Sequence, residues 1–118
     1  MKFKKAPPEL VEFITNKMKN VKADYRNMFG YPAYFINGNM FAGLFGGKLY
    51  LKLSEQDMVE IKKICKEVTN LEPMPGRPMK GYVVLPKSMY SDEATFSEWL
   101  ERSIKYASSL PPKQTKQK

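Results

Sequence analysis

Apolar residues recur every three to four positions in three segments of the chain, which is the spacing of an amphipathic helix. This pattern predicts helices over residues 8–20, 55–67 and 92–109. Proline is favoured in the first helical turn, so the first of them should begin at Pro7 or Pro8. The third is the longest and stops before a pair of prolines.

The second predicted helix has a clear start, because Ser54 followed by Asp57 resembles an N-cap with an acidic residue in the first turn. Its apolar stripe should face the core. The residues of that stripe are Met58, Ile61, Ile64, Cys65 and Val68.

Between the first two predicted helices the pattern is that of strands and turns, and eight of the 15 aromatic residues fall within residues 25–53. Asn37-Gly38 and Gly46-Gly47 are typical of two-residue hairpin turns, which need a positive φ. Gly30-Tyr31-Pro32 predicts a bulge or bend inside the first strand. The turns separate three predicted strands, over residues 26–36, 39–45 and 48–53.

A proline-rich loop follows the second helix, with a short strand at Asn70-Leu71 before it and a clear strand over 81–85 after it. The element order is therefore α-β(3)-α-β(2)-α. It predicts a two-layer α+β fold in which an antiparallel sheet packs on helices, rather than a doubly wound parallel sheet. We expect one domain over residues 8–110, a basic N-terminal arm over 1–7 and a disordered basic tail over 111–118.

Composition excludes several kinds of chemistry. The 118 residues contain no histidine and one cysteine, Cys65. Histidine-based catalysis and multi-cysteine zinc sites are therefore ruled out, and we expect neither a metal nor a cofactor.

No apolar run reaches the roughly 18 residues that cross a membrane, and no secretory signal pattern opens the chain. These features favour a cytoplasmic protein with no membrane association.

The chain carries a formal charge of +8, but the excess is concentrated at its ends. Residues 6–110 hold 14 basic and 12 acidic side chains, because six of the lysines lie outside this range. Lysine-rich ends are typical of solubilising tails, whereas a domain that binds nucleic acid usually carries a basic patch on its folded surface.

Several short stretches in both halves of the chain form an ordered series of motifs. In the first half these are residues 26–30 (RNMFG), 37–42 (NGNMFA) and 49–52 (LYLK). In the second half they are residues 75–79 (PGRPM), residues 82–86 (YVVLP) and Trp99. Together these stretches resemble the N-terminal domain of the TfoX/Sxy family. The resemblance spans about residues 8–110 and is greatest to short, stand-alone members.

The resemblance implies the same two-layer α-β(3)-α-β(2)-α arrangement. Two-domain TfoX/Sxy proteins regulate natural competence through transcription, and this chain ends where their C-terminal domain would begin. The expectation is therefore a regulatory or binding module, and the competence role of the two-domain proteins is not carried over to it. The resemblance supplies no catalytic residues.

Two places could form a binding site. The first is the proline-framed loop, in which Gly76 and the flanking prolines would hold Arg77 near Lys80. Arg77 and Lys80 could then bind a carboxylate or phosphate; the alternative is a stiff turn between strands. At the bend after the first helix, Arg26 and Tyr31 should be exposed; the alternative is a bend whose other residues belong to the core.

The aromatic strands, interleaved with lysines, resemble a base-stacking sheet, although a core with a dimerisation surface explains them as well. Gly46-Gly47-Lys48 fails the phosphate-loop pattern, because Leu49 stands where a serine or threonine is needed. Cys65 lies near lysines, which favour a reactive thiol, but its apolar stripe favours a structural role.

We therefore expect a non-enzymatic regulatory or binding module that acts by contact with an unknown protein partner or as a homodimer. The alternative is a weak nucleic-acid-binding accessory protein that uses the lysine tails, Arg77 and Lys80. A third hypothesis is a small enzyme that uses Arg77, a carboxylate and Cys65.

Overall fold

The computed structural model describes residues 7–19, 21–28, 31–72, 76 and 81–111. The helices in this part of the chain are α1 (Pro8–Lys17), α2 (Glu55–Ile64), α3 (Lys87–Tyr90) and α4 (Glu93–Ser109). The strands are β1 (Asp24–Met28), β2 (Tyr31–Ile36), β3 (Asn39–Phe45), β4 (Lys48–Lys52), β5 (Thr69–Asn70) and β6 (Tyr82–Leu85).

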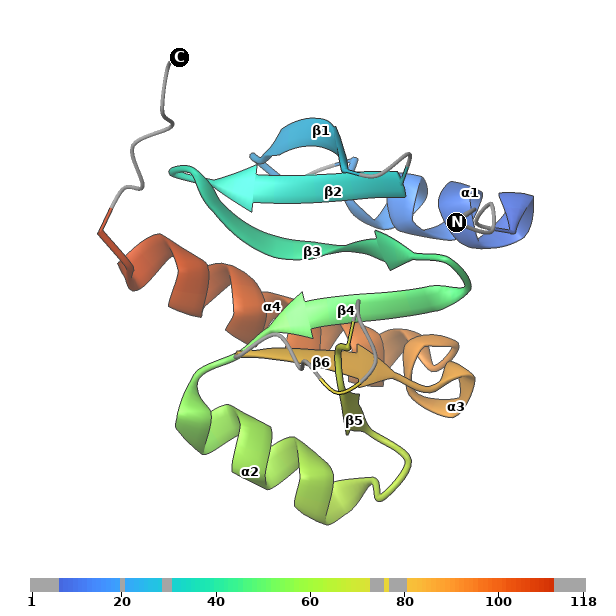
Figure 1. The fold of residues 1–118 in the computed structure, drawn as a ribbon, viewed down its shortest axis with the longest axis vertical. Helices are drawn as coiled ribbons and strands as arrows, with labels where there is room; N and C mark the ends of the chain where they lie inside the picture. The colour runs from blue at the N-terminus through green and yellow to red at the C-terminus, as the bar shows by residue number, and fades with distance from the viewer. Residues whose placement is uncertain (1–6, 20, 29–30, 73–75, 77–80, 112–118) are drawn as a thin grey trace.

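The described strands form one antiparallel sheet in the order β1-β2-β3-β4-β6-β5. Figure 1 shows α1 and α4 behind this sheet, with α2 beside the edge that carries β5. The expected α+β class is confirmed, and groups of helices and strands alternate in the expected order. The helices and the sheet form two layers because each element has one apolar face to bury.

The strand predicted over residues 26–36 is instead two strands, so the first group contains β1 in addition to the three that follow. Met28 pairs with Tyr31 and Asp24 with Phe35, which means that the chain reverses between Met28 and Tyr31. The predicted bulge or bend inside one strand is therefore a reversal between two strands, and Gly30 itself lies outside the described residues. Two short strands that pair with each other satisfy their backbone groups locally, whereas one long strand would extend past its neighbour. An irregularity in register does occur, between Tyr34 and Phe35.

The two predicted hairpin turns are confirmed. Asn37 and Gly38 have φ values of 53° and 81°, the left-handed pair that a tight hairpin between β2 and β3 needs. Gly46 has a φ of 62°, and Phe45 pairs with Lys48 across the turn. Short loops of this kind keep β2, β3 and β4 in sequence order within the sheet.

The helix starts follow the predicted chemistry, but two helices end earlier than expected. Pro8 opens α1, and the Ser54 hydroxyl accepts a hydrogen bond of 3.2 Å from the Asp57 amide at the start of α2. The first helix ends at Lys17 and the second at Ile64. Ile64 was expected to be buried, yet 60% of its surface is exposed; it is the last residue of the helix, and Ile61 is the residue of this helix that is fully buried.

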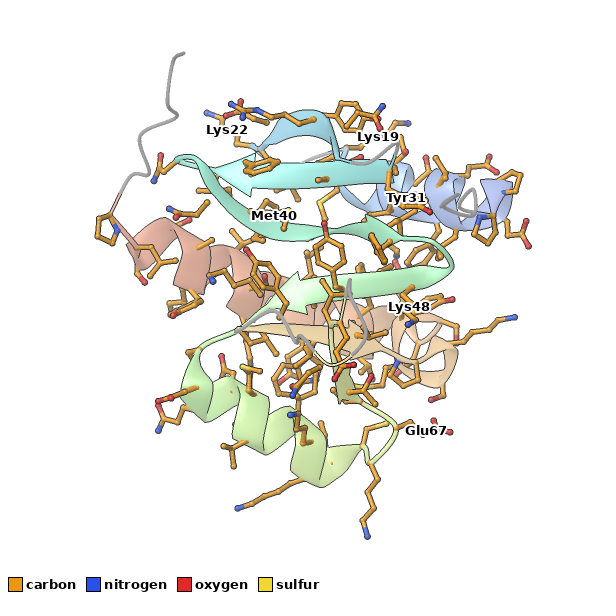
Figure 2. The ribbon with its side chains drawn as sticks, viewed as in Figure 1. Lys19, Lys22, Tyr31, Met40, Lys48 and Glu67 are labelled. Atoms are coloured by element: carbon orange, nitrogen blue, oxygen red, sulfur yellow. The ribbon has the colours of Figure 1, made fainter. Side chains whose placement is uncertain are left out.

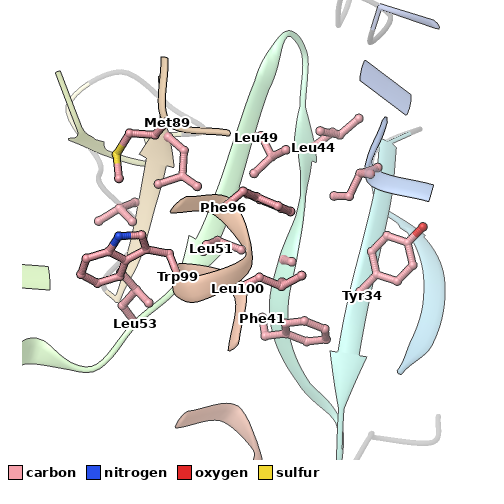
Figure 3. Packing of buried hydrophobic residues seen from close by; sticks show 14 of the residues in the cluster. Tyr34, Phe41, Leu44, Leu49, Leu51, Leu53, Met89, Phe96, Trp99 and Leu100 are labelled. Carbon is pink, nitrogen blue, oxygen red and sulfur yellow. The ribbon is translucent and has the colours of Figure 1, made fainter. Parts of the chain in front are cut away.

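The main core lies between the sheet and the helices α1 and α4. Figure 3 shows Phe96 and Leu100 of α4 beside Leu51 of β4, and Trp99 of the same helix beside Leu53. On the same helix the buried Ser103 hydroxyl donates a 3.0 Å hydrogen bond to the carbonyl of Phe41 in β3. This bond fixes the height of α4 along the sheet, because a buried hydroxyl without a partner would destabilise the fold.

A smaller cluster lies on the opposite face of the sheet, which we call the outer face. It contains the buried residues Tyr50, Leu71 and Tyr82, with Met40 and Phe45 packed against them. Strand alternation separates these side chains from the main core, since neighbouring residues on a strand point to opposite faces.

The predicted basic arm and tail, residues 1–7 and 111–118, lie outside the described residues except for Pro7 and Pro111. Within the described part of the chain, no helix is long and apolar enough to cross a membrane.

Candidate functional site

Arg26 and Tyr31, predicted together as exposed members of one bend, have different surroundings. Arg26 is exposed on β1, and its guanidinium carbon lies 5.1 Å from the ring centre of Phe35. Tyr31 is only 3% exposed, and its ring lies 5.3 Å from that of Phe45. The expected exposure of Tyr31 is wrong because its ring packs against Phe45 of the neighbouring strand and belongs to a cluster of buried residues. The two residues do not share an exposed site.

The aromatic rings of the outer face are buried rather than displayed. Tyr50 and Tyr82 are 3% and 8% exposed, and their rings meet edge to face at 5.8 Å. The Tyr82 hydroxyl donates a 2.9 Å hydrogen bond to the carbonyl of Met40, a residue of β3 that is labelled in Figure 2. The Tyr50 hydroxyl donates to the Met40 sulfur at 3.3 Å.

This burial changes the acidity of both phenols. Loss of solvation raises the pKa of Tyr82 to about 12, and burial together with the neighbouring Tyr82 raises the pKa of Tyr50 above its ordinary value. A base-stacking surface needs ring faces open to solvent. These rings therefore have the environment of a second core, not that of a nucleic-acid platform.

The proline-framed loop falls mostly outside the described residues. Gly76 is exposed and has a φ of 80°, a conformation that glycine adopts readily. Arg77 and Lys80 lie outside the described residues, as do the lysine-bearing ends. Binding of an anion or a nucleic acid by these residues stays a prediction.

A groove that the sequence did not predict lies along α2. It has a volume of about 1320 Å³ and is open to solvent on one side. Its lining comes from the end of β4, one face of α2, β5, the residue before β6 and the last turns of α4. The lining residues are Lys52, Leu53, Ser54, Glu55, Gln56, Met58, Val59, Lys62, Asn70, Gly81 and Tyr106.

Helical periodicity explains which part of α2 faces the groove. Glu55, Met58, Val59 and Lys62 recur at a spacing of three and four residues, so they form one stripe along the helix. Ile61, on another side of the helix, is fully buried in the main core. The helix therefore buries one side and presents a second, partly apolar side to the groove.

The groove combines an apolar floor with ammonium groups at its rim. Val59 is 56% exposed although it is aliphatic, and the half-buried Met58 and Tyr106 supply further apolar surface. The Lys62 ammonium binds the amide oxygen of Asn70 at 2.7 Å, a neutral acceptor that leaves its charge in place. The Lys52 ammonium lies 4.6 Å from the ring centre of Tyr82.

Arg102 links α4 to α2, the two helices that contribute residues to the groove. Its guanidinium binds Asp57 at 3.2 Å and Glu60 at 3.1 Å on α2, and Glu98 at 2.9 Å on α4. Its guanidinium carbon also lies 4.3 Å from the ring centre of Trp99. The hydrogen bond to Glu60 is the main cause that raises the pKa of Arg102 above its ordinary value, so the guanidinium stays charged.

The described residues show no arrangement typical of catalysis. Cys65 is half-buried at the end of α2, and its side chain packs against the main core. The carboxylates of Asp57, Glu60 and Glu98 are bound to the guanidinium of Arg102. Among the described side chains, no group of three or more acidic or cysteine residues is placed to hold a metal ion.

The sequence did contain one indication of the groove. Val59 is an aliphatic residue that stands off the apolar stripe of its helix, where a polar residue is usual. The residues that complete the groove come from four other elements, and their proximity depends on the tertiary fold.

Comparison with known proteins agrees with this architecture. The model of the TfoX N-terminal domain family matches residues 16–107, which is most of the chain and includes every strand. No curated protein matches the chain. The matched segment covers the sheet, α2 and nearly all of α4, and so includes the whole lining of the groove. The chain therefore belongs to the TfoX N-terminal domain family.

Proposed function

We propose that this protein is a non-enzymatic, TfoX-like regulatory module that binds a segment of another protein in the groove along α2. Membership of the TfoX N-terminal domain family supports a regulatory or binding role, and this is not a known enzyme family. The described residues offer a groove for binding and no arrangement for breaking bonds.

The observation that carries the proposal is the exposure of Val59 beside an open groove. Exposed aliphatic surface beside a polar rim is the usual composition of a protein-binding surface. The groove volume of about 1320 Å³ is enough for several side chains of a bound peptide. An aliphatic side chain that is 56% exposed gains stability when a partner covers it.

The charges at the groove define the partner's chemistry. Lys52 and Lys62 place two ammonium groups at the rim, whereas Glu55 is the one carboxylate among the described lining residues. A segment that carries apolar side chains flanked by carboxylates would complement this surface. An amphipathic acidic helix or an acidic extended segment fits this description.

The proposal can be tested by selecting peptides from a randomised display library on the whole protein. We expect enriched peptides to combine aliphatic or aromatic residues with Asp or Glu. Their binding should weaken at least about tenfold in Val59→Asp, because a carboxylate would then meet both an apolar side chain and a like charge.

Lys63→Glu is the matched control, since Lys63 is exposed on the same helix but does not line the groove. Its binding should stay close to that of the unaltered protein. Selection of no peptides, or of peptides that bind Val59→Asp as tightly as the original chain, would exclude the groove as a protein-binding site.

A further inference from the structure

Strand β1 forms one edge of the sheet and exposes a row of polar and aromatic side chains. In the order β1-β2-β3-β4-β6-β5, its outer side faces no other described strand. Asp24, Tyr25, Arg26 and Asn27 are all exposed. The opposite edge, β5, is only two residues long. An unpaired strand edge can add a strand from another chain, and β1 has the length to do so.

We propose that β1 pairs antiparallel with β1 of a second copy of this chain, with Tyr25 on the two-fold axis. In this register Asp24 of each copy lies opposite Arg26 of the other. The pairing would join two sheets into one continuous sheet across the dimer. The β1 interface lies on a different surface from the α2 groove, so a result that excludes one of the two proposals leaves the other unchanged.

The charges of β1 select this register. Directly opposed residues of an antiparallel pair point to the same face, so two-fold symmetry must place one residue opposite itself. With Asp24 or Arg26 at the centre, that charged residue would face its own copy. With Asn27 at the centre, Arg26 would face Met28. Of the four registers centred on Asp24 to Asn27, the one centred on Tyr25 alone brings opposite charges together, and it does so twice.

The side chains are already placed for these contacts. Within the sheet Asp24 pairs with Phe35 and Arg26 with Ala33, so both charged side chains stand on the outer face. Packing of the Arg26 guanidinium over the Phe35 ring reduces the conformational freedom that pairing would cost.

On the other face Tyr25 is 55% exposed, and its ring lies 5.5 Å from that of Tyr34. The axis would bring the two Tyr25 rings of the dimer together. Their contact would remove apolar surface from water at the centre of the interface.

Charge reversal provides the test. Arg26→Glu makes Asp24 face a carboxylate, and Asp24→Lys makes Arg26 face an ammonium group. Sedimentation velocity on the unaltered chain should show a dimer that dissociates on dilution, and each variant alone should dimerise at least about tenfold more weakly. An equimolar mixture of the two variants should dimerise again, because every facing pair then combines opposite charges.

The matched control is Lys63→Glu, a charge reversal of an exposed residue on α2, which should leave dimerisation unchanged. Circular dichroism of each variant verifies that the fold is retained. A chain that stays monomeric at all concentrations overturns the proposal, since the charges would then serve to keep the edge unpaired. Single variants that dimerise like the original chain, or a mixture that stays monomeric, also overturn it.

A crosslink tests the register independently. In a Cys65→Ser background, Tyr25→Cys places two thiols opposite each other across the axis, at a separation that a disulfide can span. Oxidation should give a covalent dimer at low protein concentration. The same experiment with Glu67→Cys, an exposed residue that follows α2, should give little dimer. Equal crosslinking at the two positions contradicts the proposed register.

Discussion

At the scale of single residues, close approach decides which side chains the outer face can hold. Gly43 lies opposite Tyr50 on the neighbouring strand. A Cβ atom at Gly43 would lie 2.5 Å from the Tyr50 hydroxyl and 2.8 Å from the carbonyl oxygen of Pro32. Because Gly43 has no side chain, the buried Tyr50 ring can lie directly over it on the outer face.

Gly43→Ala should destabilise the fold by roughly 1–3 kcal/mol, because the added methyl group meets both the Tyr50 ring and the rigid backbone of Pro32. Urea denaturation measures this loss. Gly47→Ala is the control, since its Cβ would have no neighbour within 4 Å, and it should change the stability by less than about 0.5 kcal/mol. Equal stability of the two variants would show that Tyr50 does not depend on Gly43.

Other single-residue features were readable from the sequence to different degrees. The positive φ values of Asn37 and Gly38 follow from local chemistry, and the turn was predicted correctly. The burial of Tyr31 was not, because it depends on which strands flank β2 and on what packs over its ring.

At the scale of elements, α2 is attached to the rest of the molecule by a charged contact as well as an apolar one. Ile61 enters the main core, while Asp57 and Glu60 bind Arg102 of α4. The i,i+4 pair Glu98 and Arg102 was predictable from the sequence, but its extension to α2 was not. A side chain can reach a second helix only when tertiary packing brings that helix near.

Arg102→Ala should lower the free energy of unfolding by about 1–2 kcal/mol, more than an isolated surface ion pair contributes, because three carboxylates lose one shared partner. Arg102→Lys should recover only part of the loss, since an ammonium group cannot reproduce the planar fork or its stacking on Trp99. Thermal denaturation at low and high salt measures both effects.

Lys105→Ala, on the exposed surface of the same helix, is the control for loss of a positive charge. If it destabilises the chain as much as Arg102→Ala does, then net charge rather than the contact with α2 is responsible.

At the scale of the whole molecule, two apolar clusters lie on opposite faces of one sheet. The cluster on the outer face contains the ionisable phenols of Tyr50 and Tyr82. Tyr82 has its pKa raised from 10.0 to about 12 by burial. Between these values an unfolded chain loses the Tyr82 proton while the folded chain keeps it. The contribution of protonated Tyr82 to the free energy of unfolding is therefore fully present below pH 10 and is lost as the pH rises toward 12.

We expect the free energy of unfolding to fall by roughly 2 kcal/mol across this range on account of Tyr82. Tyr82→Phe should remove this part of the alkaline slope. At pH 8 the same variant should lose about 1 kcal/mol, from its hydrogen bond to Met40. Urea denaturation at a series of pH values separates the slope from the constant loss. Tyr90→Phe, whose ring packs on Phe13 in the main core, is the control and should retain the slope.

The sequence by itself determined the features that depend on neighbours along the chain. Helix starts follow from Pro8 and Ser54, hairpin turns from Asn37-Gly38 and Gly46, and the α+β class from the alternation of helical and strand patterns. Each of these is set by backbone φ, by a local hydrogen bond or by the period of apolar residues.

The tertiary structure decided what depends on residues far apart in the sequence. It separated β1 from β2, buried Tyr31, and assembled a groove from Leu53, Val59 and Tyr106. Burial and proximity are properties of packing: an apolar side chain has the same local pattern whether it faces the core, a groove or a second copy of the chain. Only the placement of the elements around it distinguishes these cases.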